Sequence, residues 1–149
     1  MKHPPLDPHT NFEASKFSAD GFLGDDTRSI EDIIADDRRA LEQAGVTLDA
    51  LAHALESAYQ KTRDGMGAPV EIAPGVIGEF EESRGRLPCP FRGCGVFEKG
   101  EARLTDTHTG NTLIVTSLGI HLIAKHGFFQ GTGSRYRIDP RLSAAMLLT

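Results

Sequence analysis

The sequence has no tryptophan, only two cysteines and no long apolar run. Its most apolar segment, residues 118–129, is shorter than the roughly 20 apolar residues that cross a bilayer, and it contains a lysine and two histidines. Prolines at positions 4, 5 and 8 interrupt the N-terminus, which therefore lacks the apolar region of a signal peptide. We expect a cytoplasmic protein without a membrane span.

The two cysteines, Cys89 and Cys94, lie close together in the segment LPCPFRGCG. In a reducing compartment such a pair is more often a metal or redox site than a structural disulfide. Pro90 and Gly93 favour the tight turn that lets two thiolates reach one ion, and Gly95 frees the chain beyond it. Backbone N–H groups in such a turn can also point at the sulfur atoms. The segment favours a metal-binding turn; free thiols or a short-loop disulfide are the alternatives.

The charged residues are unevenly distributed along the 149-residue chain, which is 39% hydrophobic and 25% charged like ordinary soluble globular proteins. Residues 1–83 hold 7 Lys/Arg and 17 Asp/Glu, whereas residues 84–149 hold 9 and 4. This pattern indicates either a basic part that meets a polyanion such as nucleic acid, or two parts that neutralise each other across an internal interface. The second explanation is the simpler one.

Residues 1–24 show no regular periodicity and predict an extended arm. The arm contains three phenylalanines, which a segment made only for solubility would not be expected to carry. We therefore expect them to dock on the body of the protein or on a partner. They are Phe12, Phe17 and Phe22.

Two amphipathic helices are predicted to form an acidic hairpin within residues 25–83. The first ends at Gly45, and the second has Thr47 as its N-cap and ends before Gly65. The residues that can cap the first helix are Asp25, Asp26 and Thr27. The apolar stripes comprise Ile30, Ile33, Ile34, Leu41 and Ala44, then Leu48, Leu51, Leu55, Ala58 and Tyr59. Two short strands or extended segments are expected between the second helix and position 86.

After the cysteine turn, the sequence predicts a β-hairpin followed by a helix. Alternation predicts one strand over residues 96–104, the sequence THTGN predicts a turn at 107–111, and β-branched residues predict a return strand over 112–116. Ser117 can cap a helix that ends at Gly127. The hairpin brings the helix back to the cysteines.

The predicted helix carries two histidines, His121 and His126, that complete a set of four ligands. Positions five apart lie about 140° apart round a regular helix, so the last turn must tighten or fray for both to reach one ion. The order Cys-x4-Cys, hairpin, helix, His-x4-His resembles a Cys2His2 zinc finger, with Cys89, Cys94, His121 and His126 at the matching positions. The resemblance covers residues 87–128, with 26 residues between the second Cys and the first His, more than in the DNA-reading finger. It implies a tetrahedral zinc between turn and helix that supplies folding energy.

The ligand types indicate whether such a zinc is catalytic. Four Cys and His ligands close a tetrahedral shell, whereas a hydrolytic zinc keeps one position for water and usually has a carboxylate base beside it. The sequence has neither a His-Glu-x-x-His nor a His-x-Glu motif. We therefore expect structural zinc, with a metal-dependent enzyme as the third hypothesis. His108, in the predicted hairpin turn, is expected to be exposed and not a ligand.

The segment at 127–142 combines glycines, two phenylalanines and several arginines. Aromatic residues that alternate with arginines beside glycines suit stacking on bases and contact with phosphates. In the alternative, Phe128 and Phe129 complete the core, and Tyr136 and Ile138 form a final strand whose outward residues are the arginines. We favour this alternative for the phenylalanines; for the arginines both readings stay open.

Together these features predict an α+β fold in which an N-terminal helical hairpin packs with a zinc-stabilised β-hairpin plus helix. The expected parts are an arm over residues 1–24, the acidic hairpin and connector over 25–83, and a basic zinc-binding part over 84–149, the last two forming one compact unit. The favoured function is a non-enzymatic zinc-binding protein that contacts nucleic acid or a nucleic-acid-associated partner. The alternative is a protein-protein interaction or regulatory module that uses the acidic helices. The residues expected to contact nucleic acid or the partner are Arg84, Arg86, Arg92, Arg103, Arg135, Tyr136, Arg137 and Arg141.

Overall fold

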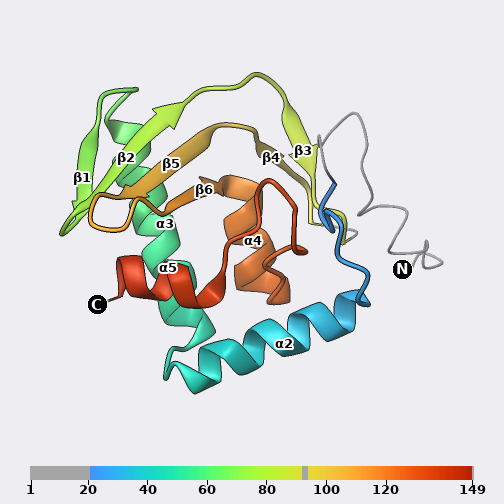
Figure 1. Ribbon diagram of the computed structural model, residues 1–149. Helices are drawn as coiled ribbons and strands as arrows, with labels where there is room; N and C mark the ends of the chain where they lie inside the picture. Colours follow the sequence, from blue (N-terminus) through green and yellow to red (C-terminus); the bar gives the residue numbers. More distant parts are fainter. Residues whose placement is uncertain (1–20, 92–93, 149) are drawn as a thin grey trace.

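The computed structural model describes residues 21–91 and 94–148, and it has the predicted α+β fold (Figure 1). Most of the predicted arm, with Phe12 and Phe17, lies outside the described residues, and positions 21–24 form turns rather than an extended segment. Among the described helices, none is both long and apolar enough to cross a membrane. The elements are α2 (Ile30–Gln43), α3 (Leu48–Asp64), β1 (Val70–Ala73), β2 (Val76–Glu81), β3 (Arg86–Pro88), β4 (Val96–Glu98), β5 (Glu101–Asp106), β6 (Thr112–Thr116), α4 (Ser117–His126) and α5 (Pro140–Leu147).

Each of the first two helices begins at a hydroxyl cap. Ser29 caps α2 and Thr47 caps α3, each by accepting a hydrogen bond of 3.1 Å from the backbone N–H three residues on. The second cap was predicted from the sequence. The prediction of a first cap at positions 25–27 is wrong, because the Asp26 carboxylate binds the Arg28 guanidinium instead.

The connector between α2 and α3 turns at Gly45, whose φ of +70° favours glycine. The two helices diverge from this point instead of lying side by side (Figure 1). Helix α3 packs on the main sheet, on α4 and on α5, whereas α2 packs chiefly against α5. Both predicted helices are therefore present, but they diverge, and helix α5 contacts each of them.

The main sheet is antiparallel, with strand order β1-β2-β5-β6. Alternate side chains face the helices: Ala102 and Leu104 of β5 and Leu113 and Val115 of β6 are all buried. The two short strands predicted before position 86 are β1 and β2, and the predicted return strand is β6. The register of β5 on β6 runs from Glu101↔Thr116 to Thr105↔Thr112.

The predicted single strand over residues 96–104 is wrong, because the chain changes sheets at Gly100. Strand β4 pairs with β3 in a separate two-stranded sheet, and β5 pairs within the main sheet. The Phe80 ring lies 2.4 Å from the point where a Cβ on Gly100 would stand, so this position cannot carry a side chain without a rearrangement. Gly100 therefore stands, packed against Phe80, where the chain passes from the two-stranded sheet to the main sheet.

Two apolar clusters fill the interior formed by the described residues. The larger lies between the main sheet and helices α3, α4 and α5, and it includes Leu55, Tyr59 and Leu104. The smaller, called here the second cluster, consists of Phe22, Leu23, Ile30, Ile33, Cys89, Leu118, Leu122 and Phe128. Helix α4 contributes to both clusters, so a metal ligand on α4 would be fixed by the core on two sides.

The N-terminal end of the described chain is bound to the loop that follows α4. The Gly131 N–H donates to the Phe22 carbonyl at 2.8 Å, and the Asp25 N–H donates to the Thr132 carbonyl at 3.1 Å. A Cβ on Gly131 would lie 2.3 Å from the Leu23 carbonyl oxygen, so only glycine permits this approach. These bonds place Phe22 and Leu23 in the second cluster.

The C-terminal segment confirms the packing role of the paired phenylalanines, since Phe128 is 0% and Phe129 1% exposed. The predicted final strand at Tyr136 and Ile138 is wrong: turns lead into helix α5 instead. Pro140 occupies the first turn of α5, and Asp139 caps it. Proline, which has no backbone N–H, suits the first turn of a helix because an N–H at that position would have no partner within the helix.

Candidate metal centre

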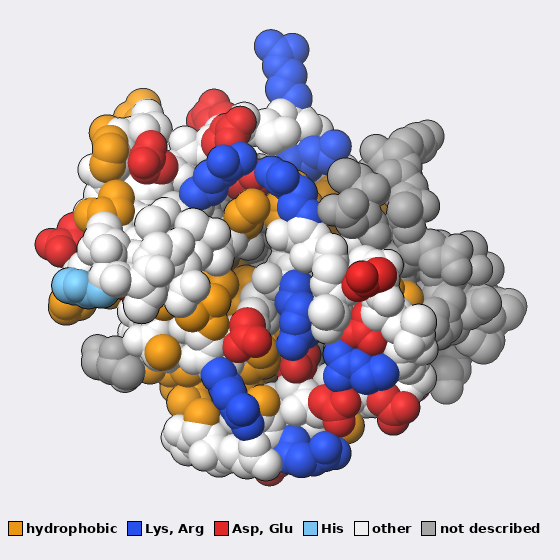
Figure 2. All heavy atoms as spheres, in the orientation of Figure 1, with side chains coloured by type: hydrophobic (Ala, Val, Ile, Leu, Met, Phe, Trp, Pro, Cys, Tyr) orange, Lys and Arg blue, Asp and Glu red, His pale blue; other side chains and the backbone are white. Residues whose placement is uncertain are grey.

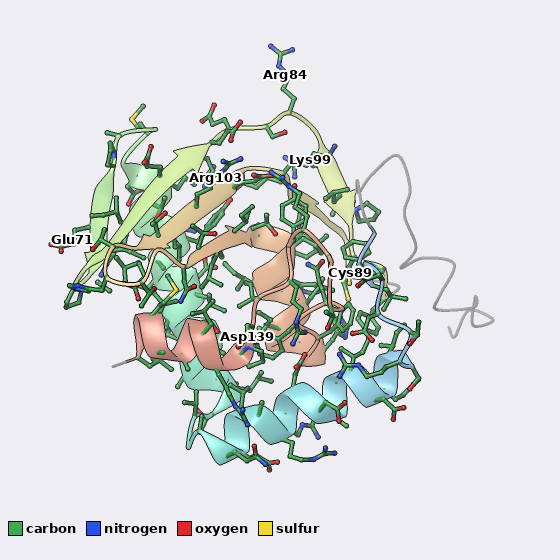
Figure 3. The ribbon with its side chains drawn as sticks, in the orientation of Figure 1. Glu71, Arg84, Cys89, Lys99, Arg103 and Asp139 are labelled. Atoms are coloured by element: carbon green, nitrogen blue, oxygen red, sulfur yellow. The ribbon has the colours of Figure 1, made fainter. Side chains whose placement is uncertain are left out.

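The cysteine turn is the closed end of the β3–β4 hairpin. The pairing of Pro88 with Val96 brings the two sides together, and the Cys89 N–H donates to the Gly95 carbonyl at 3.3 Å. Gly95 has a φ of +87°, which agrees with the predicted need for glycine at the exit. Residues 92 and 93 lie outside the described chain. Figure 3 labels Cys89 at this end of the hairpin, beside α4.

Helix α4 supplies the two histidines. Thr116 caps the helix by accepting the Gly119 N–H at 2.9 Å, one residue before the predicted cap. The expectation of a tightened or frayed last turn is wrong, because the Gly127 N–H donates to the Ile123 carbonyl at 3.0 Å as in a regular α-helix. The rings of His121 and His126 nevertheless meet edge to face, with centroids 5.3 Å apart.

The four predicted ligands converge at one point. Cys89, Cys94, His121 and His126 each offer one ligand atom, and these atoms all lie within 4.8 Å of one another. The His126 Nε2 atom lies 3.7 Å from the Cys89 sulfur and 3.5 Å from the Cys94 sulfur. A set of two thiols and two imidazoles at these separations is compatible with one metal ion.

The surroundings of the four side chains affect their protonation. Burial raises the pKa of the Cys89 thiol to about 12; a hydrogen bond from the Phe91 N–H lowers it and Cys94 raises it. Burial also lowers the pKa of His121 and of His126, with the Lys125 charge acting in the same direction. The neutral imidazole is the form that binds metal. A metal ion would have to displace the proton of the Cys89 thiol, whereas the histidines already favour the ligating form.

The histidines differ from the other described histidines in their surroundings. The Nε2 atom of His121 is buried and has no hydrogen-bond partner among the described residues, which is unusual for a buried polar atom. His53 and His108 are exposed on α3 and in the β5–β6 turn, and neither belongs to the cluster. The exposed position predicted for His108 is confirmed.

Sequence reasoning missed two aromatic residues beside the centre. Phe91 lies between the two cysteines, and its ring stacks on the His126 ring with centroids 4.0 Å apart. Phe97 lies in β4 and stacks on His121 at 4.5 Å. The signal in the sequence was their closeness to Cys89 and Cys94, but linear closeness does not reveal which ring each phenylalanine faces.

Several of the residues predicted to contact nucleic acid or a partner bind groups within the protein. Glu101 accepts the Tyr136 hydroxyl and forms ion pairs with Arg135 at 3.3 Å and with Arg103 at 3.7 Å. Arg103 also pairs with Glu81, at 3.2 Å. Figure 2 shows Lys/Arg and Asp/Glu side chains interspersed over this face.

Two of the predicted arginines cross to helix α2, in the acidic part of the sequence. Arg137 forms an ion pair with Asp37, and Arg141 donates a hydrogen bond to the Gln43 side chain. These contacts agree with the simpler explanation of the uneven charge, in which the basic and acidic parts meet internally.

Two of the remaining predicted arginines lie on the approach to the cysteine turn. Arg84 and Arg86 are exposed, and in the described part of the chain neither forms an ion pair. Arg84 points away from the body of the protein (Figure 3). Arg92 falls outside the described residues.

Comparisons with protein-family models, with curated proteins and with solved structures find no match for the chain. The likeness to a zinc finger therefore rests on the four clustered side chains and the order of the elements that carry them.

Proposed function

We propose that this is a non-enzymatic zinc-binding protein whose single zinc ion joins the cysteine turn to helix α4. The proposal rests on the convergence of four side chains, those of Cys89, Cys94, His121 and His126. With Zn–S bonds of about 2.3 Å and Zn–N bonds of about 2.0 Å, a tetrahedral ion separates sulfur from nitrogen by about 3.5 Å. The separations of 3.7 and 3.5 Å at His126 support such an ion.

The chemistry of the four side chains supports zinc and a structural role. Thiolates with imidazoles in a tetrahedral arrangement suit zinc, whereas magnesium, calcium and manganese prefer oxygen ligands. Four such ligands leave no coordination position for a substrate or a reactive water. The ion stabilises the fold by joining a three-residue strand pair to α4, which a small hairpin could not do through apolar contacts alone.

Metal analysis of the full-length protein tests this proposal. The purified protein is expected to retain one zinc per chain, and Cys94→Ser is expected to lose it, because the variant removes one of the two thiolates. His108→Ala and His53→Ala are matched controls, since both histidines are exposed outside the cluster. Wild-type protein without zinc, or equal zinc loss in the controls, would contradict the proposal.

A second part of the proposal is contact with nucleic acid, or with a nucleic-acid-associated partner, next to the zinc site. The supporting observation is that Arg84 and Arg86 are exposed without an ion pair among the described residues, on the segment that enters β3. Arginines of this kind can pair with phosphates, and zinc would give the strand that carries Arg86 a fixed position. Arg137 contributes less to nucleic-acid binding in this proposal, because it is already paired with Asp37 inside the protein.

Binding of a fluorescent single-stranded RNA, measured as salt is raised, tests the second part. Affinity is expected to fall steeply with salt, and Arg84→Ala with Arg86→Ala is expected to weaken it and reduce the salt slope. Arg39→Ala on α2 is the control, because Arg39 is exposed far along the acidic helix. Salt-independent binding, no binding, or equal weakening by the control would contradict nucleic-acid contact and leave the zinc proposal standing.

A further inference from the structure

Both imidazole rings of the metal centre lie flat against phenyl rings from the cysteine-bearing segment. The Phe91 and His126 rings are inclined by 19°, with centroids 4.0 Å apart. The Phe97 and His121 rings are inclined by 29°, at 4.5 Å. The hairpin that supplies the sulfur atoms therefore also supplies a flat surface for each nitrogen ligand.

Metal-binding histidines usually receive their orientation from a hydrogen bond. The second ring N–H normally donates to a carboxylate, a carbonyl or a water, and this bond fixes the plane of the ring. Within the described part of the chain, neither His121 nor His126 hydrogen-bonds to a carboxylate or a carbonyl; the bonds of His126 are to the two sulfur atoms. Among the described residues, the groups that contact the flat faces of the two rings are therefore the phenyl rings of Phe91 and Phe97.

The two phenylalanines are themselves well placed for this task. The Phe91 ring meets Phe128 edge to face, with centroids 5.9 Å apart, and Phe128 is fully buried. Phe97 lies in β4 and packs against the second cluster. Each phenyl ring is thus fixed by the protein core on one side and contacts a histidine on the other.

We propose that Phe91 and Phe97 are positioning residues of the metal centre, which set the planes of the His126 and His121 rings by stacking. The inference rests on the proposed zinc site. By fixing the ring planes, the phenyl groups aim each ligating nitrogen at the point between the sulfur atoms. They also cover the rings with apolar surface, which limits the approach of water to the ion.

Metal titration of full-length variants tests the proposal, with Co²⁺ as the spectroscopic probe and Zn²⁺ measured by competition with a chromophoric chelator. Phe91→Leu and Phe97→Leu keep an apolar side chain but remove the flat face. Each is expected to weaken metal binding about tenfold and to change the ligand-field spectrum of bound Co²⁺. Phe91→Tyr and Phe97→Tyr keep the flat ring at positions that are only partly buried, and they are expected to keep the wild-type affinity and Co²⁺ spectrum.

Phe80→Leu is the matched control. Phe80 packs against the larger cluster and meets Tyr59 edge to face, so its loss is expected to lower stability without changing the Co²⁺ spectrum. Normal metal affinity and a normal Co²⁺ spectrum in both leucine variants would overturn the positioning role. An equal loss of affinity in Phe80→Leu would do the same. In either case, zinc binding by the wild-type protein would leave the proposed function intact. Wild-type protein that binds no metal would instead overturn the proposed function.

One measurement does not depend on the variants folding. In the zinc-loaded wild-type protein, the ring protons of His121 and His126 lie over phenyl faces, so their NMR resonances are expected upfield of ordinary histidine positions. Resonances at ordinary positions would overturn the stacking arrangement.

Discussion

The guanidinium of Arg137 forms two parallel hydrogen bonds with the carboxylate of Asp37, at 2.8 Å from Nη1 and 2.9 Å from Nη2. The side chains are 18% and 6% exposed. The same Nη1 atom also donates to the Gln130 carbonyl at 2.7 Å. This ion pair therefore connects helix α2 to the loop between α4 and α5, although its two residues are 100 positions apart in the sequence.

Arg137→Ala is expected to destabilise the protein strongly, because it leaves the buried Asp37 carboxylate without its partner. Removing one member of a buried pair costs about 3–5 kcal/mol. Urea denaturation measures the loss as a lower midpoint. Arg135→Ala is the control: its ion pair with Glu101 is more exposed, and such pairs contribute at most about 1 kcal/mol. Equal losses in the two variants would contradict this account.

Acid is expected to remove stability that Asp26 contributes. Hydrogen bonds from Arg28 hold the pKa of Asp26 well below its usual value of 3.8; burial opposes this shift, and the Thr132 N–H adds to it. Because the folded pKa lies below the unfolded one, the unfolded chain binds the proton more readily. The stabilisation is complete above the unfolded pKa and is lost as the pH falls through the folded pKa.

The dependence of the urea midpoint on pH measures this contribution. Asp26→Asn is expected to be less stable than wild type near neutral pH and to lose less stability on acidification between about pH 5 and pH 1. Asp64→Asn, at an exposed position near the end of α3, is expected to keep the wild-type acid dependence. An Asp26→Asn protein with unchanged acid dependence would show that the Arg28 contact contributes nothing.

Removal of the proposed zinc ion is expected to release the N-terminal part of the second cluster. Cys89 packs there with Phe22, Leu23 and Ile33, so loss of the ion would loosen the turn on which those side chains rest. Hydrogen–deuterium exchange after chelation is expected to show faster exchange over residues 21–34 and little change in β5. Uniform loss of protection would mean that zinc stabilises the whole fold, and no change would mean that the second cluster does not need it.

The fold class and the clustering of two cysteines with two histidines were predictable because both depend on residue type and order along the chain. Amphipathic periodicity predicted α2 and α3, and the Thr47 cap followed from the hydroxyl before an apolar stripe. Two cysteines about a tight turn and two histidines on the next helix predicted the cluster that the structure contains. These signals are local, so they are readable without knowing which distant segments meet.

The features that the sequence left unresolved depend on contacts between distant residues. Residues 96–104 divide between β4 and β5 at Gly100, where the ring of the distant Phe80 lies against the glycine. The sequence alone left Arg137 available to a partner, whereas in the structure its guanidinium is hydrogen-bonded to Asp37, 100 positions away. Phe91 and Phe97 are apolar in any reading, and only the folded chain places each ring on a histidine. Residue chemistry determined which groups can bind a metal; tertiary packing decided which side chains orient them, because orientation depends on surfaces that meet only on folding.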